Sequence, residues 1–217
     1  MFALGDRWAL RFSRGRRVDG LLILAFADRD TGRILARVEQ ALALIARYDG
    51  LRYRQLLRDL DRIWVTLLSS ALGDYTPATR TCRLDKRFVL HDVVDPELIA
   101  AVIVHEATHA RLNRLGIAYA EQQRPRIEAI CTRREIAFAD KLPRGKAVRI
   151  LAEQRLAKYG NLNLWTDAAI RARHLEGGKE NLRHVGYPEW LIRAILAAGT
   201  AIFKLRQMCS HKVGRRA

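Results

Sequence analysis

The residues best suited to chemistry in this chain form an HExxH motif, in which His105, Glu106 and His109 lie in a long run without helix-breaking residues. Residues four apart on a helix lie one turn apart on the same face, so the two imidazoles can reach a single ion. Zinc–nitrogen bonds of about 2.0–2.1 Å suit that arrangement. Glu106 lies about 100° around the helix from His105, where it would flank a metal-bound water and act as general base. The motif therefore predicts metal-assisted hydrolysis with Glu106 as the catalytic residue.

A catalytic zinc site needs a third protein ligand and one open position. The next predicted helix offers Glu128, with eighteen residues between it and His109. That length lets the first helix end and the second return antiparallel past the ion. Apolar neighbours on both sides of Glu128 would bury its helix, so the predicted metal ligands are His105, His109 and Glu128. Glu135, Glu121 or a distant histidine are the alternatives for the third position.

Other polar residues have weaker assignments. Cys131 follows Glu128 by three residues, roughly on the same face, and a soft thiolate there could compete for zinc. A small, buried, apolar cysteine is the commoner role, and it is the one expected here. His91 precedes the motif by fourteen residues and is expected in a loop. A tetrahedral oxyanion needs a further hydrogen-bond donor, for which the candidates are Tyr119, His174, His184 and Tyr187.

The HExxH motif, followed after eighteen intervening residues by Glu128, resembles the ligand pattern of the gluzincin branch of zinc metallopeptidases, over roughly residues 60–142. The resemblance implies one Zn²⁺ ion, a peptide or protein substrate, and a small sheet beside the HExxH helix and a following glutamate helix. It also implies an edge strand that aligns extended substrate by main-chain pairing, for which residues 81–90 are the candidate. The metzincin pattern is not matched, because no histidine closely follows Gly116. The GxMEN motif of large gluzincin aminopeptidases is also absent, so substrate specificity cannot be taken from them.

Hydrophobic periodicity predicts a helix-dominated α+β fold with a small sheet before the long HExxH helix. The first half is expected to hold a strand at 19–27, helices at 34–45 and 51–60, a strand from about 61 to 68, a turn at 75–77 and one or two short strands in 81–90. The second half is expected to hold helices at 96–115, 125–142, 146–159, 164–175 and 188–206.

The last two predicted helices are separated by Gly177-Gly178 and Tyr187-Pro188, both of which are typical of helix ends or turns. No internal repeat or low-complexity tract divides the chain. We therefore predict a single zincin-like metallopeptidase domain over residues 1–217, in which residues 160–217 form a helical C-terminal extension.

The charge balance is strongly basic, with 39 Lys and Arg against 23 Asp and Glu, a net charge of +16. Such a charge suits nucleic acid or an anionic membrane face. The basic residues are scattered through the predicted helices, however, and the aromatic residues that stack bases are not interleaved with them. An arginine-rich solvated surface is therefore favoured over a nucleic-acid partner, and a catalytically silent zincin-like scaffold is the other alternative.

The sequence also indicates the cellular compartment in which the protein is located. Its three cysteines are far apart and form no CxxC pair, which suits a reducing environment better than a disulfide framework. No stretch approaches the roughly 18 apolar residues of a spanning helix. The apolar run at 21–27 follows a basic segment, but it is too short for a cleaved secretion signal and fits a β-strand better. We therefore expect a cytoplasmic protein without a transmembrane segment.

Overall fold

A computed structural model describes residues 12–196 and shows a helix-dominated α+β fold around one mixed five-stranded sheet. The strands are β1 (Ser13–Val18), β2 (Leu21–Phe26), β3 (Arg62–Thr66), β4 (Gly73–Thr76) and β5 (Thr81–Asp85). The helices are α2 (Thr31–Tyr48), α3 (Gly50–Asp59), α4 (Lys86–Leu90), α5 (Pro96–Arg114), α6 (Arg124–Ala139), α7 (Lys146–Lys158) and α8 (Asp167–His184). Short 3₁₀ turns lie at Pro77–Thr79, Glu121–Gln123 and Leu162–Trp165.

The strand order in the sheet is β1-β2-β3-β5-β4, so β1 and β4 form its two edges. The inner strands β2, β3 and β5 run parallel to one another, whereas both edge strands are antiparallel to their neighbours. The register aligns Ile23 with Ile63 and Ile63 with Cys82, which places a row of fully buried side chains on one sheet face. The helices pack against this face of the sheet.

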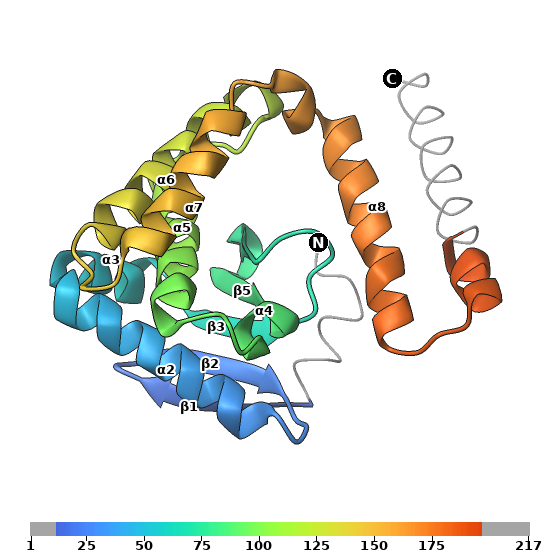
Figure 1. Cartoon of the computed structure of the whole chain (residues 1–217), viewed down its shortest axis with the longest axis horizontal. Coiled ribbons are helices and arrows are strands. Elements are labelled where there is room, and N and C mark those ends of the chain that lie inside the picture. Colours follow the sequence, from blue (N-terminus) through green and yellow to red (C-terminus); the bar gives the residue numbers. More distant parts are fainter. Residues whose placement is uncertain (1–11, 197–217) are drawn as a thin grey trace, which may run out of the picture.

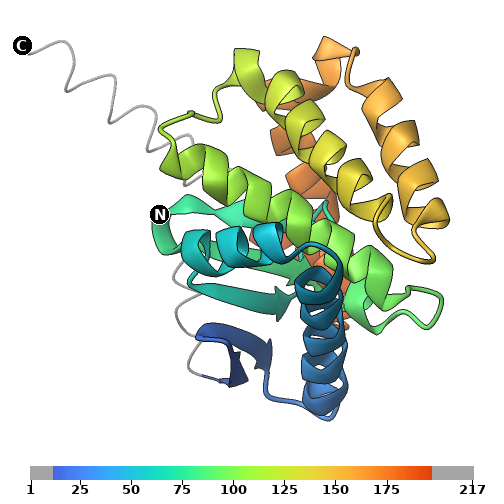
Figure 2. The ribbon, with the colours of Figure 1, turned by 90° about the vertical axis from the view of Figure 1, so that its left-hand side faces the viewer.

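The helices form two further layers over that face. The first contains α2 and α5, which pack against each other, with α3 beside them. The second contains α6 and α7, and Figure 2 shows α5, α6 and α7 as neighbouring rods. Because α5 lies between the sheet and α6, every residue from Ile99 to Glu106 is buried. The HExxH helix is thus the central element of the core rather than a surface helix.

Several predicted elements are confirmed, with small shifts of their ends. The predicted helices at 34–45, 51–60, 96–115, 125–142 and 146–159 correspond to α2, α3, α5, α6 and α7, and the strand at 19–27 corresponds to β2. The junction between α2 and α3 is tight, because the carboxylate of Asp49 accepts a hydrogen bond from the backbone N–H of Arg52 and caps α3. The basic segment before β2 belongs to β1, which the sequence did not predict.

The region between β3 and α5 differs from the prediction. The expected turn at 75–77 is partly β4, and the second half of the expected strand region 81–90 is helix α4. Asp85 causes the second difference. Its buried carboxylate accepts hydrogen bonds from the backbone N–H groups of Arg87 and Phe88, which starts a helix, and from that of Leu68, which fixes the segment after β3.

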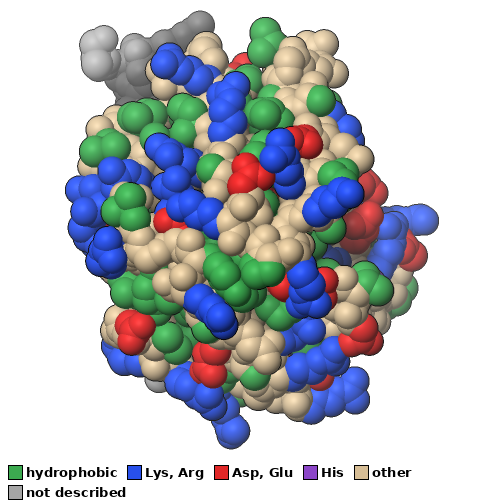
Figure 3. All heavy atoms as spheres, turned by 60° about the vertical axis from the view of Figure 1, so that its left-hand side comes forward, with side chains coloured by type: hydrophobic (Ala, Val, Ile, Leu, Met, Phe, Trp, Pro, Cys, Tyr) green, Lys and Arg blue, Asp and Glu red, His purple; other side chains and the backbone are tan. Residues whose placement is uncertain are grey.

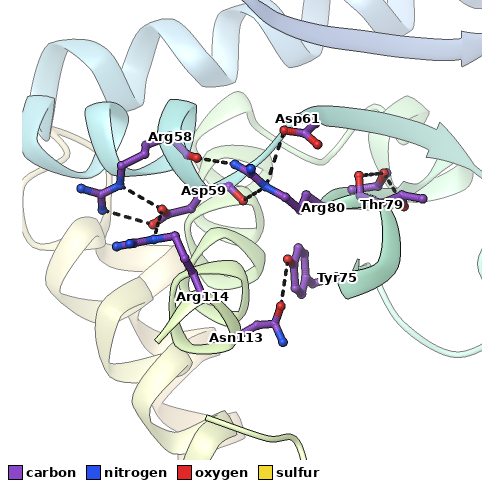
Figure 4. A network of polar contacts seen from close by, with 9 residues as sticks. Arg58, Asp59, Asp61, Tyr75, Thr79, Arg80, Asn113 and Arg114 are labelled. Atoms are coloured by element: carbon purple, nitrogen blue, oxygen red, sulfur yellow. Dashed lines mark hydrogen bonds and ion pairs between the residues drawn. The ribbon is translucent and has the colours of Figure 1, made fainter. Parts of the chain in front are cut away.

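The far end of α5 is tied to the sheet by a network around the buried carboxylate of Asp59, shown in Figure 4. That carboxylate accepts hydrogen bonds from Arg58 at 3.0 Å and from Arg114, near the end of α5, at 2.7 Å. Arg80, just before β5, donates to the main-chain oxygens of Arg58 and Asp59 and lies 3.5 Å from the carboxylate of Asp61. A buried charge is tolerated only when it is paired in this way, so the network fixes α3, β5 and α5 relative to one another.

Helix α8 runs through the expected break at Gly177-Gly178 and ends at His184, so the predicted helix end there is wrong. Gly177 is the reason. A β-carbon at this position would lie 1.0 Å from the main-chain oxygen of Ser69, so α8 can rest on the 67–72 loop only where the side chain is missing. Residues 189–196 are again helical, and the rest of the predicted 188–206 helix lies outside the described residues.

Figure 1 shows α8 set apart from the α5–α7 group. The imidazole of His174 on this helix lies 3.4 Å from the hydroxyl of Ser70, so α8 touches the loop that leads into edge strand β4. Within residues 12–196, no helix is both long and apolar enough to cross a membrane.

The contact at Gly177 predicts that a substitution there changes the local stability of α8, and the neighbouring Gly178 provides the control. Gly177→Ala should loosen α8 from the 67–72 loop and speed proteolysis between residues 160 and 188 at least severalfold, because the new methyl group overlaps backbone. Gly178→Ala should do the opposite, since nothing lies within 4 Å of its added β-carbon and alanine favours a helix by about 1 kcal/mol over glycine. Limited proteolysis followed by mass spectrometry measures both. Equal protection of the two variants would contradict the packing described here.

Candidate metal centre

The HExxH side chains are presented by the buried middle of α5. His105 and Glu106 expose only 7% and 6% of their surface, and His109 is partly buried one turn further on. The rings of His105 and His109 have centroids 5.1 Å apart, as expected for residues four apart on one helix face. The two imidazoles therefore share one site, in agreement with the spacing of the motif.

Glu128 on α6 faces both imidazoles. One of its carboxylate oxygens lies 3.2 Å from Nε2 of His105, and the other lies 3.3 Å from Nε2 of His109. The antiparallel packing of α6 on α5 brings about this meeting across eighteen intervening residues. All three residues predicted as metal ligands therefore converge on one point.

Glu135 also meets His105, but on the opposite side of the ring. Its carboxylate lies 3.3 Å from Nδ1 of His105, is completely buried, and forms an ion pair with Arg155 of α7. Metal-binding histidines usually direct one ring nitrogen at the ion and the other at a carboxylate, as Nε2 and Nδ1 do here. Glu135 therefore supports the ring orientation of His105 and does not lie at the third ligand position that the sequence left open to it.

Cys131 lies between these two glutamates on α6 and is completely buried. Its sulfur and one nitrogen of each histidine all lie within 4.8 Å of one another. A buried group of His105, His109 and Cys131 could therefore hold a metal ion. The sequence had favoured a purely apolar role for this cysteine.

The charges of the histidine–carboxylate cluster are strongly coupled. Burial alone would lower the pKa of His105, but hydrogen bonds to Glu128 and Glu135 outweigh it and raise that pKa to about 10. Burial also disfavours the charged form of Glu128, yet its bonds to the two histidines hold the pKa of this carboxyl well below its ordinary value. In the absence of metal, His105 is therefore an imidazolium that bridges two carboxylates.

Glu106 has a different environment, because it faces the sheet. Its pKa is raised from 4.5 to about 7, first by burial and then by the nearby carboxylates of Glu128 and Asp74, against the effect of the histidines. A carboxyl with a pKa near neutrality can both accept and release a proton. This is the property that a general base requires.

Edge strand β4 passes directly beside Glu106. A β-carbon on Gly73 would lie 3.2 Å from Cγ of Glu106 and 2.7 Å from Cγ1 of Val102, so only glycine lets the strand approach α5 this closely. Further along β4, the Tyr75 hydroxyl lies 3.5 Å from the side-chain oxygen of Asn113 on α5 (Figure 4). The strand expected to be the sheet edge, within 81–90, is instead the inner strand β5, so that prediction is wrong.

Tyr119, from the loop between α5 and α6, reaches the same point. Its hydroxyl donates a hydrogen bond of 2.5 Å to Glu128, and its ring packs edge-on against His109. The Arg124 guanidinium lies 5.5 Å from the centre of that ring and is itself paired with Asp167 of α8. Burial and the Glu128 carboxylate raise the pKa of Tyr119, so its hydroxyl keeps its proton and can donate it.

The other sequence candidates lie elsewhere. Glu121 accepts a hydrogen bond from the backbone N–H of Asp167, and His174 meets Ser70. His91 follows α4 directly, and His184 lines a surface pocket with residues of α4 and the β2–α2 turn. Within residues 12–196, no hydrogen bond or ion pair joins these residues or Tyr187 to the HExxH cluster. Sequence reasoning missed Gly73 and Arg155, which carry no motif and are recognisable only by position.

Comparisons with protein-family models, with curated proteins and with solved structures found no match to this chain. What the centre does must therefore be argued from its own geometry.

The burial of Glu106 predicts a pH-dependent stability. Because its folded pKa of about 7 exceeds the ordinary 4.5, the folded protein holds a proton that the unfolded chain has released, and folding loses stability as pH rises between these values. Glu106→Gln cannot ionise, so relative to wild type it should gain about 1–3 kcal/mol of unfolding free energy between pH 5 and pH 8. Urea unfolding with a chelator present measures this difference. The exposed Glu153→Gln is the control, and a Glu106→Gln difference that is the same at both pH values would contradict the burial of this charge.

Proposed function

We propose that this protein is a zinc-dependent peptidase whose ion is held by His105, His109 and Glu128. One observation carries the proposal. Two imidazoles and a carboxylate from neighbouring antiparallel helices meet at one point, with the buried carboxyl of Glu106 on the same helix as both histidines. This is the donor set of a His₂Glu catalytic zinc site.

The spacing of the donor atoms fits the ion. Two ligand atoms at about 2.0–2.1 Å from a tetrahedral zinc lie about 3.3–3.4 Å apart. The carboxylate oxygens of Glu128 lie 3.2 and 3.3 Å from the ligand nitrogens of His105 and His109. These separations are compatible with ligands of one tetrahedral ion, and the proton on His105 is displaced when the ion binds.

When bound, zinc supplies a Lewis acid that polarises a carbonyl and lowers the pKa of water to about 7. The side chains around it then have separate tasks. Glu106 accepts the proton of the attacking water and passes it to the leaving amine, which its pKa near neutrality allows. Tyr119 points its protonated hydroxyl at the ligand position, where it can donate a hydrogen bond to the oxyanion.

Strand β4 is the element that would align the substrate. This strand is one of the two edge strands of the sheet, is antiparallel to β5, and passes against Glu106 at Gly73. An extended peptide that pairs with the outer side of β4 would bring its carbonyls past the catalytic carboxyl. A peptide or protein substrate therefore fits this site.

The same arguments support a zincin-like fold, in which a small sheet, an HExxH helix and a following glutamate helix succeed one another along the chain. Both described cysteines are free and buried, which suits a cytoplasmic location. Nucleic acid is not the proposed partner. In Figure 3, Lys and Arg side chains are spread over the visible face with acidic side chains among them, and many of the arginines are paired with carboxylates.

The proposal predicts separable losses of metal and turnover. Wild-type protein should copurify with about one zinc ion, the double variant His105→Ala and His109→Ala should hold none, and Glu106→Gln should keep its zinc but lose at least a hundredfold in hydrolysis of peptide substrates. Elemental analysis and cleavage of a fluorogenic peptide library measure the two quantities.

The matched control for this test is Glu97→Gln on the same helix, where the carboxylate pairs with Arg144 away from the site. It should change neither zinc content nor turnover by more than a small factor. Zinc that persists in the double-histidine variant would remove the basis of the proposal, and zinc binding without any Glu106-dependent hydrolysis would favour a silent scaffold.

A second prediction concerns the support of His105. Glu135→Gln should weaken zinc affinity by about 10–100-fold without abolishing binding, because the neutral amide orients the ring but no longer increases its basicity. Competition with a chromogenic chelator measures the affinity. Glu128→Gln should cost more, as it removes a ligand, so an equal loss in both variants would contradict the division of roles.

A further inference from the structure

We propose that the thiolate of Cys131 is a further ligand of the bound ion, so that helix α6 offers both an oxygen and a sulfur donor. The inference rests on the metal-binding part of the proposed function and extends it to the chemistry of the ligand set. The sulfur lies with one nitrogen each of His105 and His109 in a group whose atoms are all within 4.8 Å of one another.

The position of Cys131 on α6 explains why it can reach the ion. It follows Glu128 by three residues, so both side chains lie on the helix face that packs against α5. Its side chain is completely buried, and burial raises the pKa of its thiol. The nearby carboxylates of Glu128, Glu106 and Glu135 raise it further, and these groups surround the same site. The thiol therefore faces the cluster of metal-binding groups rather than a purely apolar layer.

Distances show which of the two donors on α6, Glu128 or Cys131, lies closer to the spacing required of metal ligands. The Glu128 oxygens already match the spacing of ligands on a tetrahedral ion, whereas nitrogen and sulfur ligands of one zinc lie about 3.5 Å apart, given bonds of about 2.0 and 2.3 Å. The sulfur and the two histidine nitrogens all lie within 4.8 Å of one another, so each nitrogen–sulfur distance needs to shorten by at most about 1.3 Å to reach the ligand spacing. Glu128 already contacts both imidazoles, whereas Cys131 reaches the ligand spacing after a small closure.

The chemistry of this step is simple. When the ion binds, the S–H bond of Cys131 breaks, the proton leaves to solvent and a sulfur–metal bond forms. With His105, His109 and Glu128 the sulfur completes four protein donors, which closes a tetrahedral site. The sulfur must then leave before substrate can enter. The same ligand biases the site toward zinc, cobalt and cadmium over magnesium or manganese.

The test uses Co²⁺ added to the metal-free full-length protein. Thiolate bound to cobalt gives an intense near-ultraviolet charge-transfer band, which nitrogen and oxygen ligands do not give, while visible ligand-field bands report binding itself. Wild type should show both bands. Cys131→Ser should keep the visible bands and lose the ultraviolet one, and Cys82→Ser, which removes an equally buried thiol on strand β5, should keep both.

Cadmium gives a second measurement. The ratio of Cd²⁺ to Mn²⁺ affinity should fall at least tenfold in Cys131→Ser and stay unchanged in Cys82→Ser. Cobalt that binds wild type with visible bands but no charge-transfer band would overturn the sulfur ligand and leave the His₂Glu proposal intact. Failure of wild type to bind cobalt would overturn both. A charge-transfer band without peptide hydrolysis would support the sulfur ligand and count against the peptidase.

Discussion

The centre depends on the register between α5 and α6. The imidazole of His105 lies between two carboxylates of one helix, with Glu128 at Nε2 and Glu135 at Nδ1. These glutamates are seven residues apart, or about two helical turns. A slide of α6 by one turn, about 5.4 Å, would remove both contacts at once. Because the imidazolium bridges them only in this register, the pairing fixes the position of Cys131 and the path of the Tyr119 loop as well.

The same burial creates an electrostatic problem. Helix α5 is covered by the sheet on one side and by α6 on the other, yet it carries His105 and Glu106 in its buried stretch. A buried charge is costly unless it is paired. Without metal, the proton on His105 and the guanidinium of Arg155 compensate part of the carboxylate charge. A divalent cation at the ligand position would compensate it more completely, which is a physical reason for such an acidic cluster in a strongly basic protein.

The approach to the centre is framed by elements that contribute no ligand. Gly73 lets β4 press against α5 beside Glu106, and the 67–72 loop that leads into β4 is held on one side by Asp85 and on the other by α8 at Gly177. Arg124 links the Tyr119 ring to Asp167 at the start of α8. Helix α8 therefore contacts the loop that leads into the strand proposed to align substrate, and it pairs with Arg124, which packs on the ring of Tyr119.

The sequence by itself determined the local part of this protein. Helical spacing placed His105 and His109 on one face, apolar neighbours marked the helix of Glu128, and the periodic segments gave most helices to within a few residues. It could not give strand order, because periodicity shows which face of an element is buried and not which element covers it. The edge strand, the support of His105 by Glu135 and Arg155, and the glycine inside α8 were decided by tertiary contacts. Each of these depends on the approach of segments far apart in sequence, as Gly177 shows, since the backbone of Ser69 needs the space that a side chain would fill.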